Sequence, residues 1–141
     1  MGFQIGNIVK SVYAKLNSDT TLDNLISNIY VSSMPKNATY PCIVIGDNDL
    51  IETPFNVFGK KGKDSILNIY IYDSSNSDLT NIGVAERVDT LLDWKDDLSI
   101  DSNNHVKTAI QTSTMGYDLT TVEGTELRFV KLQYKITTDE T

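Results

Sequence analysis

Two side chains of this chain have the chemistry of a nucleophile and a general base: Cys42, the single cysteine, and His105, the single histidine. A thiolate activated by an imidazole is a common arrangement for covalent catalysis. Cys42, however, lies in the apolar run 41–45, where a buried and unreactive thiol is expected. His105 follows the polar segment 102–104, which is typical of a turn with solvated side chains. We therefore predict that the two residues do not form a catalytic dyad.

Three short segments resemble ligand-binding loops only in part. Residues 59–64, Gly-Lys-Lys-Gly-Lys-Asp, are similar to a phosphate loop, but Val57 stands where its first glycine is required. Residues 47–49 and 101–105 begin like calcium loops and lack the glycine at the sixth position. Turns whose side chains bond to their own backbone explain both segments better. We expect no catalytic residue, cofactor site or metal site, and we predict that the chain is not an enzyme.

The acidic side chains are concentrated in one part of the sequence. Twelve Lys and Arg against nineteen Asp and Glu give a net charge of -7, which disfavours attraction to nucleic acid or to anionic membranes. Segment 73–101 holds eight acids and two bases, a local balance of -6. No apolar run approaches the roughly 20 residues of a membrane-spanning helix, so no membrane association is expected. The charge pattern instead favours contacts between complementary protein surfaces.

Glu86, Asp89 and Asp93 are spaced three and four apart, so a helix would place them on one face, opposite the apolar residues. A solvated face is the simplest interpretation. Three lysines at 60, 61 and 63 form a contrasting basic group. We hypothesise that the acidic and basic groups meet between neighbouring subunits of a ring, where each subunit uses two different surfaces.

These charged groups need a scaffold, and apolar periodicity predicts its first half. Apolar residues at helical spacing indicate a helix over 5–16, and Asp19 or Thr20 is a suitable cap for a second, shorter helix over 22–26. Strands are expected at 29–33, at 41–45, where a proline is tolerated as the first residue, and at 65–72. In the last of these, Leu67, Ile69 and Ile71 face one way, while Asn68, Tyr70 and Tyr72 face the other. Between these strands, we interpret 47–63 as a protruding hairpin arm.

The second half predicts one long helix and three strands. A broad apolar face that includes Leu79 and Ile82 indicates a helix over about 77–94. Strands are expected at 98–101, at 106–117 with a break at Gly116 or 120–124, and at 130–136. In the final strand Val130, Leu132, Tyr134 and Ile136 alternate with Lys131, Gln133 and Lys135. We predict a single α+β domain over 1–141: a largely antiparallel sheet ending in a three-stranded meander, with N-terminal helices and the long helix packed on it.

The order of these motifs resembles one protein family over nearly the whole chain. The motifs are Val-Tyr-Ala-Lys-Leu at 12–16, Leu-Ile at 25–26, Ile-Tyr at 29–30, Tyr-Pro-Cys-Ile-Val-Ile-Gly at 40–46, Glu-Thr-Pro at 52–54, Ile-Tyr-Ile-Tyr-Asp-Ser at 69–74, the helix 82–92 and the closing strands. Together they are similar to the tail-terminator or tail-completion proteins of long-tailed bacteriophages, including the tail-to-head joining type of siphophages. This resemblance implies a virion protein that is assembled in the host cytoplasm and lies at the tail-head junction.

The resemblance further implies a homo-hexameric ring on the last ring of the tail tube protein. Such a ring ends tube polymerisation and presents its other face to the head-completion protein of the connector, while DNA passes through without specific binding. No catalysis or cofactor is implied. Our candidate interface residues are Glu52, Phe55, Phe58, Lys60, Lys61 and Lys63 of the arm, and Glu86, Asp89 and Asp93 of the long helix.

Two other kinds of function stay open. One is a head-completion or minor capsid assembly protein of the phage neck. The other is a small non-viral binding module or a single-domain enzyme. An enzyme should show a pocket with perturbed titratable groups, whereas a ring subunit should expose strand edges and an arm.

Overall fold

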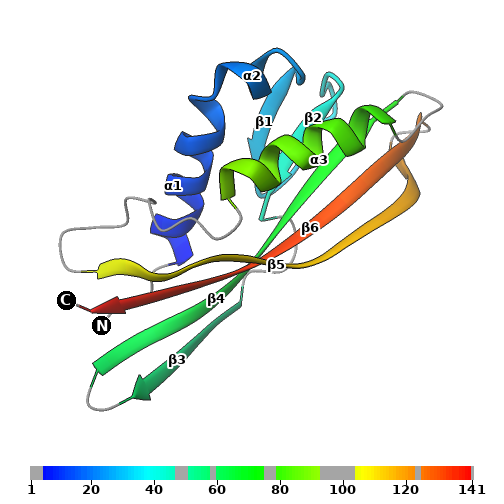
Figure 1. Cartoon of the computed structure of the whole chain (residues 1–141). Coiled ribbons are helices and arrows are strands. Elements are labelled where there is room, and N and C mark those ends of the chain that lie inside the picture. Colours follow the sequence, from blue (N-terminus) through cyan, green and yellow to red (C-terminus); the bar gives the residue numbers. More distant parts are fainter. Residues whose placement is uncertain are drawn as a thin grey trace.

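A computed structural model describes residues 5–46, 51–57, 60–74, 79–92, 104–122 and 125–140. It confirms the predicted α+β class, with N-terminal helices and one long helix packed on a largely antiparallel sheet (Figure 1). The elements are α1 (Ile5–Asn17), α2 (Thr20–Asp23), β1 (Asn28–Val31), β2 (Cys42–Ile45), β3 (Ile51–Val57), β4 (Lys60–Asp73), α3 (Leu79–Leu92), β5 (Asn104–Val122) and β6 (Thr125–Glu140).

The strands form one sheet in the order β1-β2-β4-β6-β5, and β3 pairs with β4 beside this path. Only β1 and β2 are parallel. β5 and β6 pair as antiparallel neighbours, as the last two strands of the predicted closing meander should. β6 also pairs with β4, so it lies inside the sheet, and its apolar residues that face the helices are buried. The strand predicted at 98–101 lies outside the described residues.

The main core lies between the helices and one face of the sheet. Leu67, Ile69 and Ile71 of β4 are buried on this face, as their alternation predicted, and so are Val130, Leu132, Tyr134 and Ile136 of β6. The helices contribute Ile8, Val9, Val12, Leu16, Leu22, Val84, Ala85, Val88 and Leu92. Burial of this many large apolar side chains is the dominant favourable term in the folding of a domain of this size. The helices are therefore held on one side of the sheet (Figure 1).

Two predictions about the helices need correction. The helix α2 is a single turn that ends at Asp23, so Leu25 lies beyond it and is 42% exposed. Leu79, expected on the apolar face of α3, is 76% exposed, because it begins the helix and the buried position near this end belongs to Asn81. The Asn81 side-chain amide donates to the carbonyl oxygen of Arg128 at 2.9 Å, which satisfies a buried polar group.

Strand β5 continues through Gly116 without a break, so the first of the two predicted interruptions is wrong. The strand ends at Val122, within the second predicted interruption at 120–124. Irregularities of pairing with β6 fall earlier, between Val106 and Thr114.

Within the described part of the chain, no helix has the length and apolar character needed to cross a bilayer.

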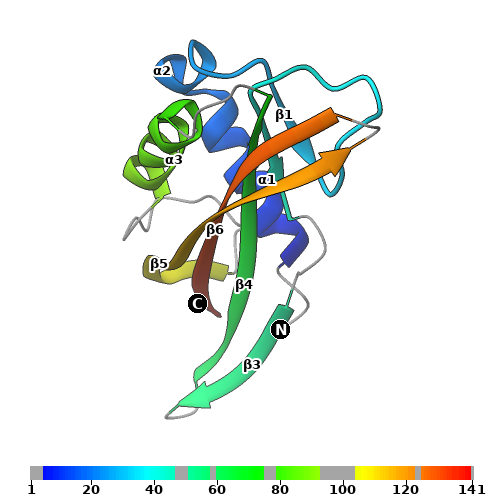
Figure 2. The same cartoon turned by 90° about the vertical axis from the view of Figure 1, so that its right-hand side faces the viewer.

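A second, smaller core covers the other face of the sheet. Cys42, Val44, Tyr72 and Leu127 are buried there. Met34 and Tyr40 pack against them from the segment between β1 and β2, which loops over this face in Figure 2. The sheet is thus covered by helices on one side and partly by an irregular segment on the other.

Candidate interaction surfaces

The hairpin arm consists of β3 and the paired part of β4. Its register places Glu52 opposite Ser65, Phe55 opposite Gly62 and Lys63 opposite Pro54. Figures 1 and 2 show this hairpin extending past the helices at one end of the molecule. Of the candidate residues of the arm, Phe58 lies outside the described residues.

The basic segment of the arm is a strand and not a loop. Lys60, Lys61 and Lys63 lie in β4, which continues to Asp73 and pairs with β3 on one side and β6 on the other. A phosphate loop must open a helix, whose N-terminal amides bind the phosphate. The partial phosphate-loop pattern at 59–64 is therefore excluded as a phosphate site by its secondary structure. Lys60, Lys61 and Lys63 instead lie at the start of β4.

The acidic face of α3 differs from the prediction at Asp89. Glu86 is exposed, as expected. Asp89 is only half-exposed, and its Oδ1 accepts a hydrogen bond of 3.0 Å from the hydroxyl of Tyr134. Because Tyr134 has no solvent exposure, its hydroxyl needs a partner within the protein, and Asp89 turns toward the sheet to supply it. Asp93 lies outside the described residues, so Glu86 is the one described residue of the three that is exposed.

The hairpin arm and α3 are not brought together within one subunit. Figure 1 shows the arm at one end of the molecule, while α3 packs across the opposite part of the sheet. A contact between the lysines of the arm and Glu86 therefore requires a second subunit.

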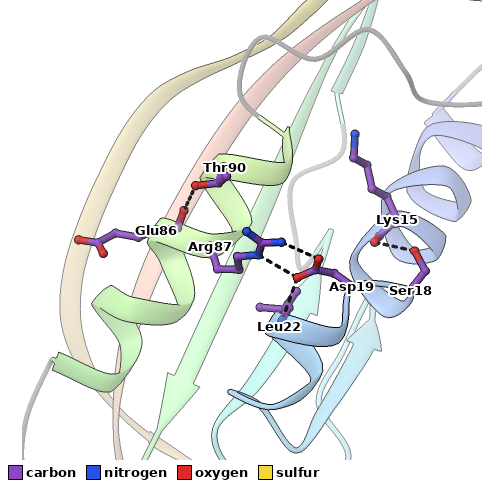
Figure 3. A network of polar contacts seen from close by, with 7 residues as sticks. All are labelled: Lys15, Ser18, Asp19, Leu22, Glu86, Arg87 and Thr90. Carbon is purple, nitrogen blue, oxygen red and sulfur yellow. Dashed lines mark hydrogen bonds and ion pairs between the residues drawn. The ribbon is translucent and has the colours of Figure 1, made fainter.

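An ion pair between α2 and α3 was not predicted. Arg87 donates from Nε to Oδ2 of Asp19 at 2.9 Å and from Nη2 to Oδ1 at 2.7 Å (Figure 3). Asp19 is also the predicted N-cap, and its Oδ2 accepts from the backbone N–H of Leu22 at 2.8 Å. The hydrogen bonds from Arg87, followed by that from Leu22, lower the pKa of Asp19 below its ordinary value of 3.8, although burial acts in the opposite direction. One carboxylate thus caps α2 and fastens it to α3.

This pair predicts a pH-dependent stability. Because folding lowers the pKa of Asp19, its stabilising effect is present above the unfolded pKa of about 3.8 and is lost as pH falls through the folded pKa. Asp19→Asn keeps an N-cap side chain and removes the charge. The variant should unfold at lower urea concentration than the natural protein at pH 7, and the difference should shrink below about pH 4.

A matched control for this experiment is Glu86→Gln, since Glu86 is an exposed carboxylate on the neighbouring helix. Its urea midpoint should stay close to that of the natural protein at pH 7. If the urea midpoints of Asp19→Asn and the natural protein differed by the same amount at pH 7 and at pH 3, the lost charge would not be the cause of the difference.

The structure separates Cys42 from His105. Residue pairing across the sheet connects Cys42 through Tyr72 and Phe129 to Asp118 of β5. His105 is thirteen positions (118 − 105) further along that strand, opposite Asp139. At about 3.3 Å per residue this is roughly 40 Å of strand, so a thiolate–imidazole hydrogen bond cannot form. His105 belongs to β5 and not to a turn, which corrects the predicted environment of this residue.

The surroundings of Cys42 also make its thiol unreactive. Its side chain has no solvent exposure and its Sγ lies 3.6 Å from Sδ of Met34. Burial, with a smaller contribution from the Asp73 carboxylate, raises its pKa from 9.0 to about 12. Both observations agree with the predicted inert thiol. Among the described residues, no three His, Cys, Asp or Glu side chains are grouped as a metal site would require.

An aromatic cluster lies on the sheet face opposite the helices. Tyr70 and Tyr72 stack at 6.1 Å between ring centroids, and Phe129 lies 6.0 and 5.8 Å from them. The ammonium of Lys131 lies 5.8 Å from the Tyr70 centroid. Alternation predicted that the two tyrosines share this face with Asn68, but the contact with Phe129 depends on pairing between β4 and β6, which alternation does not reveal.

Comparisons with known proteins identify solved structures that share this fold. No protein-family model matches the chain, and no curated protein matches it by sequence. A chain in the structure of the virion of a native gene transfer agent particle matches with a TM-score of 0.80 and 16% identity, over 99% of both chains. The gp17 protein of bacteriophage SPP1 matches with a TM-score of 0.57 and 20% identity, over 96% of both chains. At these identities the likeness establishes a shared fold.

Proposed function

We propose that this protein is a structural virion component that caps the phage tail tube as a ring, ends tail polymerisation and joins the tail to the head connector. The observation that carries the proposal is the likeness to a virion chain over 99% of both chains, with a TM-score of 0.80. The order of motifs from 12–16 to the closing strands supports the finer assignment to the tail-terminator type. The proposed partners are further copies of this chain, the tail tube protein and the head-completion protein.

The chemistry of the described residues supports a role without catalysis. Asp19 and Arg87, whose pKa values are shifted, bind each other on the helix side of the sheet. Among the described residues, the other groups with shifted pKa values are Tyr40 and Cys42. They lie on the opposite face of the sheet, where burial raises the pKa of both. Catalytic acids and bases must converge on one substrate, and these two pairs are separated by the sheet. Complementary surfaces are all that a ring protein requires.

Net acidity suits a channel for DNA. Because each subunit carries a charge of -7, the ring would repel the phosphates of DNA, so DNA would pass through without specific binding.

The two separated charged groups supply a candidate subunit contact. In a ring, each subunit presents one surface to the next subunit and a different surface to the previous one. We propose that Lys60, Lys61 and Lys63 of one subunit approach the helix face that carries Glu86 on its neighbour. The hairpin arm and α3 lie in different parts of one subunit (Figure 1), so the two surfaces are distinct, as a ring contact requires.

Charge reversal at all three lysines of the arm tests this contact. The triple change to Glu should greatly reduce ring assembly, and Glu86→Lys in the same chain should restore part of it, because the two surfaces become complementary again. Lys36→Glu is the control, since Lys36 is an exposed lysine outside both surfaces. If the variant with all three lysines reversed formed rings as well as the natural protein, the charge contact between subunits would be wrong.

Deletion of the gene in its phage tests the proposed function itself. Electron microscopy of the lysates should show tails of uncontrolled length beside unjoined heads, and expression of the intact chain should restore virions. Tails of normal length beside unjoined heads would favour the second candidate, a head-completion protein. Normal virions would contradict both.

A further inference from the structure

Three strands of the sheet have an open edge in the described structure: β1 and β5 end the main path, and β3 lies beside it. Unpaired strand edges readily pair with other chains, and proteins usually block them with proline, bulges or covering segments. The edge of β3 carries Pro54, which has no backbone N–H. The first half of β5 has three register shifts between Val106 and Thr114. These features disfavour the pairing of both edges with another chain.

The second half of β5 lacks these features. From Met115 to Val122 it pairs with β6 without a register shift and contains no proline. The edge strand β1 also lacks proline, and its Val31 is 43% exposed. One regular open edge therefore remains at each end of the path β1-β2-β4-β6-β5.

These two open edges lie at the same level of the sheet. Strand pairing forms rows that cross all five strands. One row is Asn28, Cys42, Tyr72, Phe129 and Asp118, and another is Val31, Ile45, Ile69, Leu132 and Met115. Residues 28–31 of β1 are consequently level with residues 115–118 of β5. Figure 1 shows the two strands on either side of β2, β4 and β6.

The two edges also run in opposite directions. β2 and β6 are both antiparallel to β4, so they point the same way. β1 is parallel to β2 and β5 is antiparallel to β6, so β1 and β5 point opposite ways. If copies are related by rotation about an axis along the strands, β5 of one copy meets β1 of the next in antiparallel orientation. This is the more stable kind of strand pairing.

We propose that the regular edge of β5 pairs with β1 of a second copy of this chain, so that the sheets of neighbouring subunits become continuous. A closed ring has no rise from one subunit to the next, so the surfaces that meet must be level. Level pairing sets the register: Asn28 lies opposite the neighbour's Asp118 and Val31 lies opposite its Met115. The inference rests on the proposed ring. It is an alternative to the charge contact, because Lys63 is level with Thr138 of β6, whereas Asp89 of α3 contacts Tyr134, four positions away along that strand.

Disulfide trapping in assembled particles tests this register. Particles are produced by complementing the gene deletion with Val31→Cys/Met115→Cys and then mildly oxidised. Opposed residues in paired strands are within the reach of a disulfide. We expect a ladder of cross-linked species up to the closed ring on a non-reducing gel. Cys42 should stay outside the reaction because its side chain has no solvent exposure.

A control variant places the second cysteine out of register. Val31→Cys/Thr121→Cys should give no ladder, because Thr121 is six positions (121 − 115) from Met115, about 20 Å along β5. Asn28→Cys/Asp118→Cys is an independent in-register pair that serves if the first variant does not fold. Dimers formed by Met115→Cys alone would indicate pairing of β5 with itself and would overturn the proposal.

The outcomes separate this inference from the proposed function. Particles with normal tails and a visible ring, but no ladder from either in-register pair, would overturn the strand contact and leave the ring intact. Particles that lack this protein at the tail end would overturn the ring and the strand contact together.

Discussion

Replacing Tyr134 by alanine should lower the free energy of unfolding by about 3–5 kcal/mol, the range measured when large aromatic side chains are removed from cores. Tyr134 lies in β6, which is paired on both sides, has no solvent exposure, and is among the largest fully buried side chains. Its removal leaves a cavity between the sheet and the helices, and it also removes the hydroxyl that donates to Asp89 at 3.0 Å. Because domains of this kind are stable by only about 5–15 kcal/mol, a large part of the stability should be lost.

Urea unfolding followed by circular dichroism measures this effect, and two variants serve as controls. Tyr134→Phe keeps the ring and removes only the hydroxyl, so it should cost about 0.5–1.5 kcal/mol. Val31→Ala changes a side chain that is 43% exposed on an edge strand, and its unfolding should shift little. If Tyr134→Ala cost no more than Tyr134→Phe, the placement of this ring in the core would be wrong.

Cys42 should react with thiol reagents far more slowly than an exposed cysteine. At pH 8, a pKa raised from 9.0 to about 12 reduces the thiolate fraction by roughly a thousandfold. Complete burial of the side chain adds a steric barrier to this chemical one. The native protein should therefore consume almost no iodoacetamide during a time in which an exposed thiol reacts fully, and urea should restore ordinary reactivity.

The control for this experiment adds an exposed cysteine to the same chain by Ser33→Cys, since Ser33 is exposed in the segment after β1. That variant should be alkylated rapidly at one site, which peptide mass spectrometry would assign to position 33. Rapid alkylation of Cys42 in the native protein would contradict its burial and would reopen the question of a reactive thiol.

Periodic patterns in the sequence predicted the local elements of this fold well. The apolar stripe of α1 and the alternation in β4 and β6 depend on which face of each element is buried, and the structure buries those faces. The cap at Asp19 was also predictable, because an N-cap is recognised from neighbouring residues alone.

The strand order was not predictable from such patterns. Alternation shows that a strand has one apolar face, but it does not show which strand lies beside it. The placement of β6 between β4 and β5 depends on pairs such as Leu67 with Tyr134, which are far apart in sequence. For the same reason, the level arrangement of the two open edges became visible only when all pairings were known.

The candidate surfaces were predictable in part. Helical spacing placed Glu86 and Asp89 on one face, but Asp89 lies close enough to the sheet to accept from the buried Tyr134 hydroxyl. The partner of Arg87 also could not be predicted, because Asp19 is 68 residues away and belongs to a different helix. Contacts of this kind are set by how the helices pack on the sheet.

The most direct test of the central claim is the location of this protein in particles that are blocked before head joining. Tails purified from a phage that makes no heads should carry one ring of this protein, six copies per tail, at the end of the tube that would meet the head. Cryo-electron microscopy and quantitative mass spectrometry of these tails measure both the position and the copy number. A ring at that end is the predicted result, whereas tails without this protein, with the protein bound to heads instead, would contradict the account.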